Sequence, residues 1–486
     1  MAIIFQLTLQ EFYPLKNFTT FAPHFFQLKT VLSNYRPYFK QIAKLSYPII
    51  IGQIGIVLMG VADVVMIGKI DATNLAAAGL AVSVFFVVSM IGIGTLMAVS
   101  ALVAQAKGAG RNNECALLFR HSLLSAFVIG TCISILLFLF AENLSVLKQK
   151  EDVTILAAQF LHILNFGTIP LLFFVASKQF SDGLSFTKPS AVLTIGALLL
   201  NILLNWFLIY GNCGFPKMGL AGAGYATGIS RVMMSASMII YVLVHNQYKN
   251  FIRLKDPSDQ WKIFMKILRV GLPSGFQYFF EISAFSFAGI MIGWIGKNEQ
   301  AAHHIALSIA SVTYMIATGI SAAGGIMVGD ALGRKNKPDI IRSGKAALIS
   351  GALFMGSCAV ILSSFSKVII GFYVDDIEVA GFAVYLLLIA SVFQLSDGVQ
   401  CVSLGILRGL EDTKIPTIIT IIAYWVIGIP SGYFMAFSNN MGLYGVWIGL
   451  LIALTFSALF LSQRFLRISK KIDVYKEIKI AGTGEQ

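Results

Sequence analysis

Long apolar stretches separated by short polar segments dominate the chain between residues 43 and 465. Most hold about eighteen or more residues with few charges, which is the length that an α-helix needs to cross the hydrocarbon core of a bilayer. Glycine, proline, asparagine or charged residues mark their ends. The pattern predicts twelve membrane-spanning helices, at 43–67, 76–105, 116–141, 155–178, 189–210, 219–244, 262–295, 302–330, 343–370, 379–407, 415–437 and 443–465.

The composition agrees with a membrane protein and argues against several soluble domains. Of the 486 residues, 57% are hydrophobic and 12% are charged, whereas soluble domains are near a quarter charged. So few charges cannot cover a water-soluble surface. We therefore expect an all-α integral membrane protein that folds as one membrane body.

The Lys and Arg residues gather on one side of the predicted membrane region. Loops that follow even-numbered spans hold eighteen of them, including Lys178 and Arg408, and loops that follow odd-numbered spans hold six. The positive-inside rule therefore places the even loops, and with them both termini, in the cytoplasm. The same distribution explains the net charge of +13 without nucleic-acid binding.

The second half of the chain repeats the first. A shift of 225 positions aligns Pro48 with Pro273 and the residues Met-Ile-Gly at 66–68 with those at 291–293, and shifts of 226 and 223 align later motifs. Because six spans separate equivalent positions, both halves enter the membrane in the same orientation. We expect two six-helix lobes, related by a pseudo-twofold axis along the membrane normal, that rock about a central cavity.

This organisation divides the chain into five segments. They are an N-terminal extension at 1–41 that is loose or interfacial, an N-lobe with helices 1–6 at 42–245, a cytoplasmic inter-lobe loop at 246–261, a C-lobe with helices 7–12 at 262–466, and a cytoplasmic tail at 467–486. The extension lacks the basic n-region, apolar core and cleavage site of a signal peptide.

Three carboxylates stand well inside predicted spans: Asp63, Glu281 and Asp397. Each costs about 2.5 to 3.5 kcal/mol at a helix centre on insertion scales. Ionisable groups in spans usually mark a transport pathway. The alternative is a carboxylate satisfied by hydrogen bonds between helices, without a role in transport.

Asp63 belongs to a predicted polar layer a few helical turns below the outer face. Asn201 and Asn205, four residues apart on one helix face, and Thr227 fall in the same layer. One carboxylate and neutral oxygens can bind a hard monovalent cation or a proton, although the Asn pair also suits contact between helices. Arg231, one turn after Thr227, either pairs with a carboxylate or snorkels to the lipid boundary.

The rise of an α-helix places Glu281 and Asp397 roughly 20 to 25 Å below the outer face, near the middle of the bilayer. Two carboxylates in one low-dielectric chamber resist double ionisation, so the pair is expected to bind a proton, a metal ion or a cationic substrate. Mutually exclusive occupancy is what an antiporter needs. Candidate cavity-lining residues are Gln277, Tyr278, Phe285, Phe393, Gln394 and Arg231, and the candidate Na+ ligands are Asp63, Glu281 and Asp397.

Motifs for other chemistries do not occur in the sequence. No G-x-x-x-x-G-K-[ST] loop is present, so ATP hydrolysis and an organic cofactor are not expected. The five cysteines are scattered, and His303 and His304 lack a third ligand with metal spacing. A secondary transporter is therefore favoured over an enzyme, with a membrane-embedded transferase as the alternative from another class.

Eight ordered motifs between Lys44 and Arg467 resemble the multidrug and toxic compound extrusion (MATE) family, in its NorM-like branch. They are VADVVMIG at 61–68, AQAKGAGR at 104–111, FSDGLSFTKP at 180–189, LLLNILLNW at 198–206, GLAGAGYAT at 219–227, FFEISAF at 279–285, AAHHIALS at 301–308 and QLSDGVQ at 394–400. The resemblance implies a V-shaped pair of six-helix lobes in the bacterial inner membrane. It also implies export of small cationic, amphipathic molecules such as drugs, toxins and dyes in exchange for Na+ or H+.

By that resemblance, the Asp63 layer is the cation site of the N-lobe, and Glu281 with Asp397 form the site of the C-lobe. Phe393 stands where some relatives have Tyr, and Arg231 is not typical of the family. A flippase for lipid-linked sugars is the alternative within the superfamily, but it usually has a more cationic cavity. Na+ is favoured over H+ as coupling ion, because the neutral oxygens around Asp63 are superfluous for protonation. A monomer surrounded by membrane lipids, without nucleic acid or ATP, is expected.

Overall fold

The fold is described from a computed structural model, for residues 21–147, 149–253 and 260–471. Within these ranges every regular element is a helix, and no strand is present. Eleven of the described helices are long and apolar enough to cross a membrane, and twelve spans result when one bent pair counts as a single span. The predicted all-α membrane fold is confirmed.

The helices follow the predicted order, and most of their ends differ from the predicted ones by a few residues, whereas the first helix begins 22 residues before the predicted start at 43. The first half contains α2 (Phe21–Gly68), α3 (Ala72–Gly108), α4 (Asn112–Glu142), η1 (Leu144–Leu147), α5 (Glu151–Asn165), α6 (Thr168–Gly183), α7 (Lys188–Tyr210), η2 (Asn212–Gly214) and α8 (Gly219–Val244). After η3 (Asn246–Tyr248) and α9 (Lys249–Ile252), the second half contains α10 (Gln260–Gly293), α11 (Lys297–Gly333), α12 (Lys337–Gly371), α13 (Ile377–Gly409), α14 (Lys414–Ile421), η4 (Ile422–Gly428), α15 (Ile429–Tyr433), η5 (Phe434–Ser438) and α16 (Gly442–Lys471).

Two of the irregular spans contain a proline close to the irregularity. The fourth span bends by 44° between α5 and α6, three residues before Pro170, which has no N–H to continue the helical hydrogen bonds. The eleventh span continues past Pro430 with π-helical segments on both sides, η4 and η5. Such segments accommodate the carbonyl that a proline leaves without a partner.

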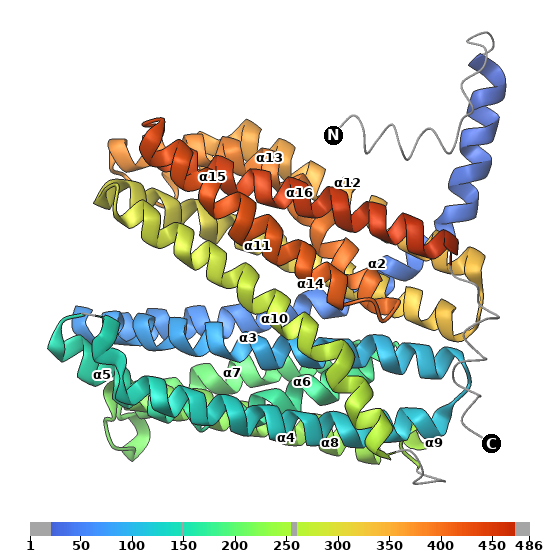
Figure 1. The fold of residues 1–486 in the computed structure, drawn as a ribbon. Coiled ribbons are helices and arrows are strands. Elements are labelled where there is room, and N and C mark those ends of the chain that lie inside the picture. Colours follow the sequence, from blue (N-terminus) through green and yellow to red (C-terminus); the bar gives the residue numbers. More distant parts are fainter. Residues whose placement is uncertain (1–20, 148, 254–259, 472–486) are drawn as a thin grey trace.

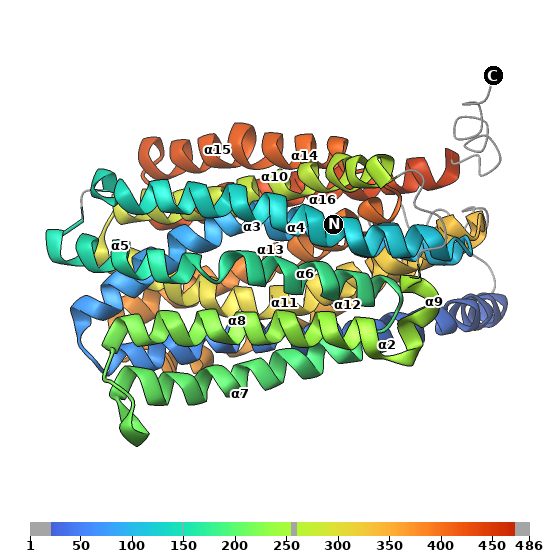
Figure 2. The same ribbon diagram turned by 90° about the horizontal axis from the view of Figure 1, so that it is seen from below.

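The helices form two lobes that lie against each other along one end of the molecule. The lobe of α3 to α8 and the lobe of α11 to α16 diverge toward the end opposite the last residues of α16 (Figure 1). Within the first lobe, α4, α6, α8 and α7 lie side by side (Figure 2). The two lobes therefore resemble a V whose arms meet near Lys471.

The first helix of each half belongs to both lobes, because it crosses from one to the other. Ile42 and Leu45 of α2 are buried in the core of the second lobe, whereas Ile267 and Val270 of α10 are buried in the core of the first (Figure 1). The helix α2 is continuous from Phe21, so the boundary expected after residue 41 is not a structural break. Residues 1–20 and 472–486 lie outside the described part.

Glycines allow α3 and α11 to pack with their backbones close together. A side chain at Gly108 would collide with the carbonyl of Asp330, and one at Gly333 with the carbonyl of Gln105. Small residues let two helix backbones approach this closely. We call the end of the molecule that contains these contacts and Lys471 the closed end.

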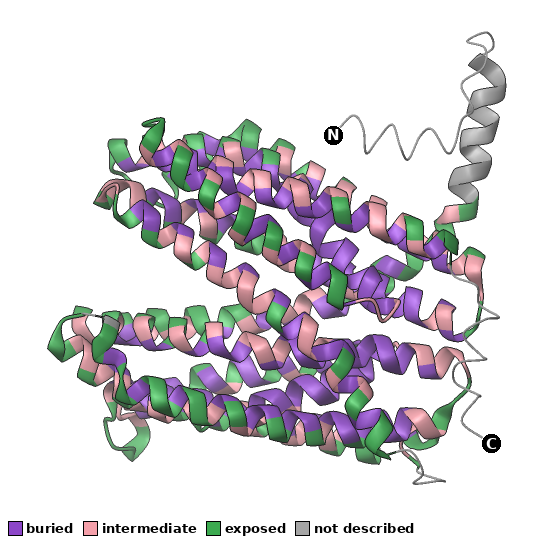
Figure 3. Ribbon diagram, viewed as in Figure 1, coloured by how far each residue is buried: buried purple, intermediate pink, exposed green. Residues whose placement is uncertain are grey.

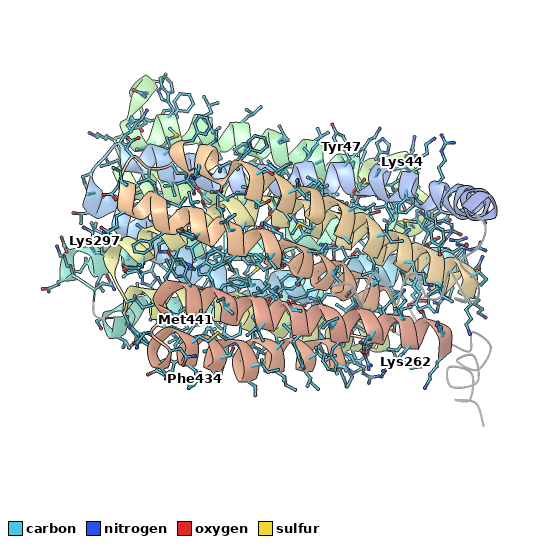
Figure 4. All side chains as sticks on the ribbon, turned by 90° about the horizontal axis from the view of Figure 1, so that it is seen from above. Lys44, Tyr47, Lys262, Lys297, Phe434 and Met441 are labelled. Carbon is cyan, nitrogen blue, oxygen red and sulfur yellow. The ribbon has the colours of Figure 1, made fainter. Side chains whose placement is uncertain are left out.

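Burial and surface chemistry match a protein surrounded by lipid. Buried residues gather inside each lobe and where the lobes meet, and exposed residues lie on the outside (Figure 3). Large apolar side chains such as Phe138, Leu199 and Val360 are more than half exposed, although their helices are long and apolar. Lys44 and Lys262 lie toward the closed end, and Lys297 toward the other end (Figure 4).

An ion cluster joins the lobes at the closed end. Lys266 of α10 lies 2.9 Å from Glu411, which follows α13 in the second lobe, and 3.7 Å from Glu114 of α4 in the first. Its Nζ also donates to Gln105 Oε1 at 3.4 Å. A single lysine thus attracts groups of both lobes.

Replacement of Lys266 by Met is expected to favour separation of the lobes at the closed end. Partly exposed ion pairs contribute about 0.2 to 1 kcal/mol each, so the loss of both pairs should raise the population of separated molecules roughly two- to thirtyfold. Spin labels at Lys188 and Lys414, which are equivalent exposed positions of the two halves, would report the change as longer distances. Lys249→Met, an exposed lysine of α9, is the control, and unchanged distances in Lys266→Met would contradict the role of the cluster.

Two basic residues expected in loops are instead buried in helices. Lys178 lies inside α6 and pairs with Asp182 at 2.8 Å, and Arg408 lies in the last turn of α13 with 7% of its surface exposed. Ion pairing explains why Lys178 is tolerated inside the protein. The remaining sixteen residues still outnumber the six on the other side.

Candidate functional site

The first polar cluster lies where α2, α7 and α8 meet, near the end opposite the closed end. Asp63 stands five residues before the end of α2, roughly 7.5 Å along the helix axis. Asn205 Nδ2 donates to Asp63 Oδ1 at 2.6 Å, and Thr227 Oγ1 donates to Asp63 Oδ2 at 2.8 Å. Two consecutive spans, α7 and α8, thus bring their polar groups to a carboxylate that lies more than a hundred residues earlier in the chain.

The two asparagines complete this cluster. Asn201 donates to Thr227 Oγ1 and accepts from Asn205, both at 3.3 Å. Asn201 and Asn205 are fully buried, and Asn205 Oδ1 has no hydrogen-bond partner in the described structure. A buried carbonyl oxygen without a donor costs free energy unless a ligand completes it. The cluster therefore has an oxygen free to accept a proton donor or a cation.

Arg231 approaches this cluster but makes no ion pair with Asp63 among the described contacts. Its guanidinium carbon lies 4.5 Å from the ring centre of Phe85 on α3, and its Nη1 is buried without a partner. The side chain also lies against Gly167, at the bend between α5 and α6, where an added Cβ would be 2.9 Å from its Cδ. Asp63 interacts with Arg231 only at longer range.

The second polar cluster surrounds Glu281 in the second half. Gln277, one turn earlier on α10, donates to Glu281 Oε2 at 2.6 Å, and Gln400 of α13 donates to Glu281 Oε1 at 2.9 Å. Gln400 also donates to the hydroxyl of Tyr424 at 3.0 Å. The carboxylate is held by neutral amides, without a basic residue in contact.

Asp397 differs from Glu281 because nothing in the described structure contacts its carboxylate through a hydrogen bond or an ion pair. It is 7% exposed and lies one turn before Gln400 on α13. The two carboxylates interact electrostatically with each other. Ionisation of a buried carboxylate without hydrogen-bond donors costs free energy. Asp397 is therefore the group that gains most from a cationic ligand or a proton.

The other candidate lining residues divide between this cluster and the packed core. Phe285 lies beside Tyr424, with ring centres 5.8 Å apart, and Gln394 donates to Thr313 at 2.7 Å while its Oε1 is buried without a partner. Phe393 packs in the core against Trp447, with ring centres 5.4 Å apart. Tyr278 lies farther toward the closed end, against Arg408.

Tyr424 is a site residue that the sequence did not single out. It lies in the π-helical segment after α14 and is 1% exposed, with its hydroxyl on Gln400. One signal was available, since a tyrosine in an apolar span needs a partner for its hydroxyl. The partner comes from a different helix, and only the folded structure identifies it.

Oxygen atoms dominate both clusters. Among the described residues, no three His, Cys, Asp or Glu side chains gather as metal ligands. A bound metal ion would therefore rely on one or two carboxylates and on neutral oxygens from Asn, Gln, Thr or Tyr. Such a set suits a hard cation, and a lone carboxylate also suits a proton.

Comparison with known proteins assigns the family. The family model described as MatE matches residues 48–207 and 273–434, one match in each half of the chain. The multidrug resistance protein NorM of Photobacterium profundum is 32% identical over 458 residues, which cover 92% of this chain and 99% of that protein. The probable multidrug resistance protein NorM of Rhizobium meliloti is 34% identical over 443 residues, covering 90% and 94%.

Solved structures support the same fold. The eukaryotic MATE transporter AtDTX14 matches with a TM-score of 0.83 at 20% identity, covering 90% of this chain and 98% of that one. An outward-facing MATE family transporter of the MOP superfamily matches with a TM-score of 0.81 at 23% identity, covering 88% and 96%. With its two repeated lobes and its family matches in both halves, the chain belongs to the MatE family of integral membrane transporters and is not an enzyme.

Proposed function

We propose that this transporter is a secondary antiporter that exports small cationic, amphipathic compounds in exchange for Na+ or H+. The observation that carries the proposal is the pair formed by Asp397 and Glu281, because both carboxylates are buried and none of the described basic residues contacts either one. A cation is the natural ligand of such a pair. The names of the relatives, which are multidrug resistance proteins, are consistent with organic cations as cargo.

The coupling follows from competition for these carboxylates. A site that holds either the cargo or the coupling ion, but not both, ties the release of one to the binding of the other. The V-shaped lobes supply the movement, because each of α2 and α10 contacts both lobes and transmits a change in one to the other. No chemical step on the cargo is required.

Na+ is the proposed coupling ion, and the Asp63 cluster is its proposed site. Asp63, Asn201, Asn205 and Thr227 present five side-chain oxygens, one of which is buried without a partner. Several oxygens are needed to replace the water around a metal ion, whereas a proton needs only the carboxylate. In this proposal Arg231 partly neutralises Asp63 while the site is empty, and it moves away from Asp63 when Na+ binds.

The experiment that tests the function is efflux of a fluorescent organic cation from proteoliposomes that contain the purified protein. Imposed Na+ and pH gradients are varied separately. Efflux that follows either gradient supports antiport, and efflux that follows neither, or that requires ATP, contradicts it. Liposomes without protein give the leak rate.

We also propose that the closed end faces the cytoplasm of a bacterial inner membrane, with both described ends of the chain on that side. The proposal rests on the excess of Lys and Arg in the even loops, one of which, Lys262, lies toward the closed end (Figure 4). In a cysteine-free variant, a cysteine at Asn112 should react with an impermeant thiol reagent only in inverted vesicles. A cysteine at Asn212 should react only in intact cells, and the reversed pattern would overturn the orientation.

A further inference from the structure

Two of the described Lys and Arg side chains are buried, and only one of them pairs with a carboxylate. Lys178 is 5% exposed and pairs with Asp182 at 2.8 Å. Arg408 is 7% exposed, contacts no carboxylate, and has a buried Nε without a hydrogen-bond partner. A buried charge without a counter-charge is strongly destabilising. Arg408 therefore needs a negative charge close to its guanidinium.

Arg408 borders a small cavity between the two lobes. The cavity has a volume of about 20 Å³, and its wall is formed by α3 and α6 of the first lobe together with α10, α11 and α13. Gln179 of α6 forms part of the same wall. It is 6% exposed and has no hydrogen bond to another described residue. The side chain of Tyr278 completes this part of the wall, with its ring centre 5.6 Å from the guanidinium of Arg408.

No carboxylate among the described residues is placed to neutralise Arg408. The wall of the cavity contains no Asp or Glu. Asp182, which occupies the position equivalent to Arg408 in the first half at a shift of 226, is already paired with Lys178. Glu281 interacts with Arg408 only at longer range, and its two oxygens accept from Gln277 and Gln400.

We propose that the cavity binds one small monovalent anion of the size of chloride, held by the guanidinium of Arg408 and the side-chain amide of Gln179. Both groups offer N–H donors, and charge-assisted hydrogen bonds from a guanidinium to an anion are the strongest available here. A volume of about 20 Å³ admits a single water-sized guest and excludes an organic molecule. The anion supplies the negative charge that the wall lacks.

The position of the site gives the anion a conformational effect. Gln179 and Arg408 belong to different lobes, so the two donors come together only while the lobes are packed as they are here. A ligand that binds one conformation stabilises it in proportion to its occupancy. Chloride is therefore expected to favour the arrangement that is closed at this end. This inference does not depend on the identity of the cargo or of the coupling ion.

The test uses the full-length protein in detergent or nanodiscs, without any gradient. Thermal unfolding is measured in sodium chloride and in sodium gluconate of equal concentration, so that Na+ and ionic strength are unchanged. The wild type should unfold at least about 2 °C higher in chloride. Arg408→Leu and Gln179→Leu should each lose this difference, and Arg342→Leu, an exposed arginine of α12, should keep it.

A direct readout covers the case in which a variant folds poorly. Bromide has an anomalous X-ray signal, so crystals grown in bromide should show one peak between Arg408 and Gln179. An anion-independent melting temperature in the wild type would overturn the proposal. So would variants that retain the chloride effect, or a cavity that contains only water in bromide.

Discussion

An Asp397→Asn variant is expected to lose at least about 97% of the gradient-driven efflux of a cationic dye, while it still inserts into the membrane. Asn preserves the volume of the side chain and removes only the charge. Truncation of one partner in a buried charge pair costs about 2 kcal/mol or more, which corresponds to a roughly thirtyfold loss of affinity. The loss is measured as the initial rate of dye release from proteoliposomes above the leak rate.

Glu281→Gln is expected to give the same loss, and the structure explains why the variant should still fold. Gln277 and Gln400 both donate to the carboxylate of Glu281. A glutamine there keeps one acceptor oxygen, although it cannot accept from both amides as well as a carboxylate does. Removal of a charge from a span also lowers the cost of membrane insertion.

The control for both variants is Asp375→Asn, which makes the same chemical change in an exposed segment before α13. Its efflux should equal that of the wild type. Wild-type efflux from either Asp397→Asn or Glu281→Gln would remove that residue from the mechanism. If Asp375→Asn loses efflux as well, the losses in the other two variants cannot be assigned to the charges of Asp397 and Glu281.

An Asn205→Ala variant is expected to need about five- to tenfold more Na+ for half-maximal efflux, with little change in efflux driven by pH alone. Asn205 donates to Asp63 at 2.6 Å and carries the buried oxygen without a partner. Loss of such a polar ligand is worth about 1 to 1.5 kcal/mol, which gives the expected shift. The measurement is dye efflux at fixed pH with Na+ stepped upward from zero.

Asn143→Ala tests whether the effect belongs to the site. Asn143 is an exposed asparagine that caps the end of α4 through the carbonyl of Leu139, so its loss should leave the Na+ response unchanged. Wild-type efflux that is independent of Na+ and follows only the pH gradient would contradict the assignment of Na+ as the coupling ion. Antiport itself would then still stand, with H+ as the coupling ion.

The two clusters are not copies of each other, although the halves of the chain are repeats. At the shift of 225, Asp63 corresponds to Ala288 and Glu281 to Ile56. Asp397 corresponds to Leu171 at the shift of 226. Each half therefore carries its acids where the other half is apolar, which allows one cluster to specialise in the coupling ion and the other in the cargo.

The sequence by itself determined the architecture of this protein. Twelve apolar stretches, the repeat and the uneven distribution of Lys and Arg require no knowledge of side-chain contacts, because span length and backbone hydrogen bonding leave a membrane segment little choice but a helix. The sequence also singled out Asp63, Glu281 and Asp397, because a carboxylate in an apolar span is conspicuous without any structure.

Only the tertiary structure decided which polar groups meet. The bonds of Asp63 to Asn205 and Thr227 join residues 142 and 164 positions apart, and the pattern along one helix cannot report such contacts. The same holds for Arg408, which the charge count assigned to a loop and which the fold buries in the wall of a cavity that Gln179 also lines. Likewise, Gly271 and Gly275 let α10 pack closely against α3 of the other lobe, and Gly319 of α11 does the same for α2. Hydrophobic periodicity does not encode such close packing between helices.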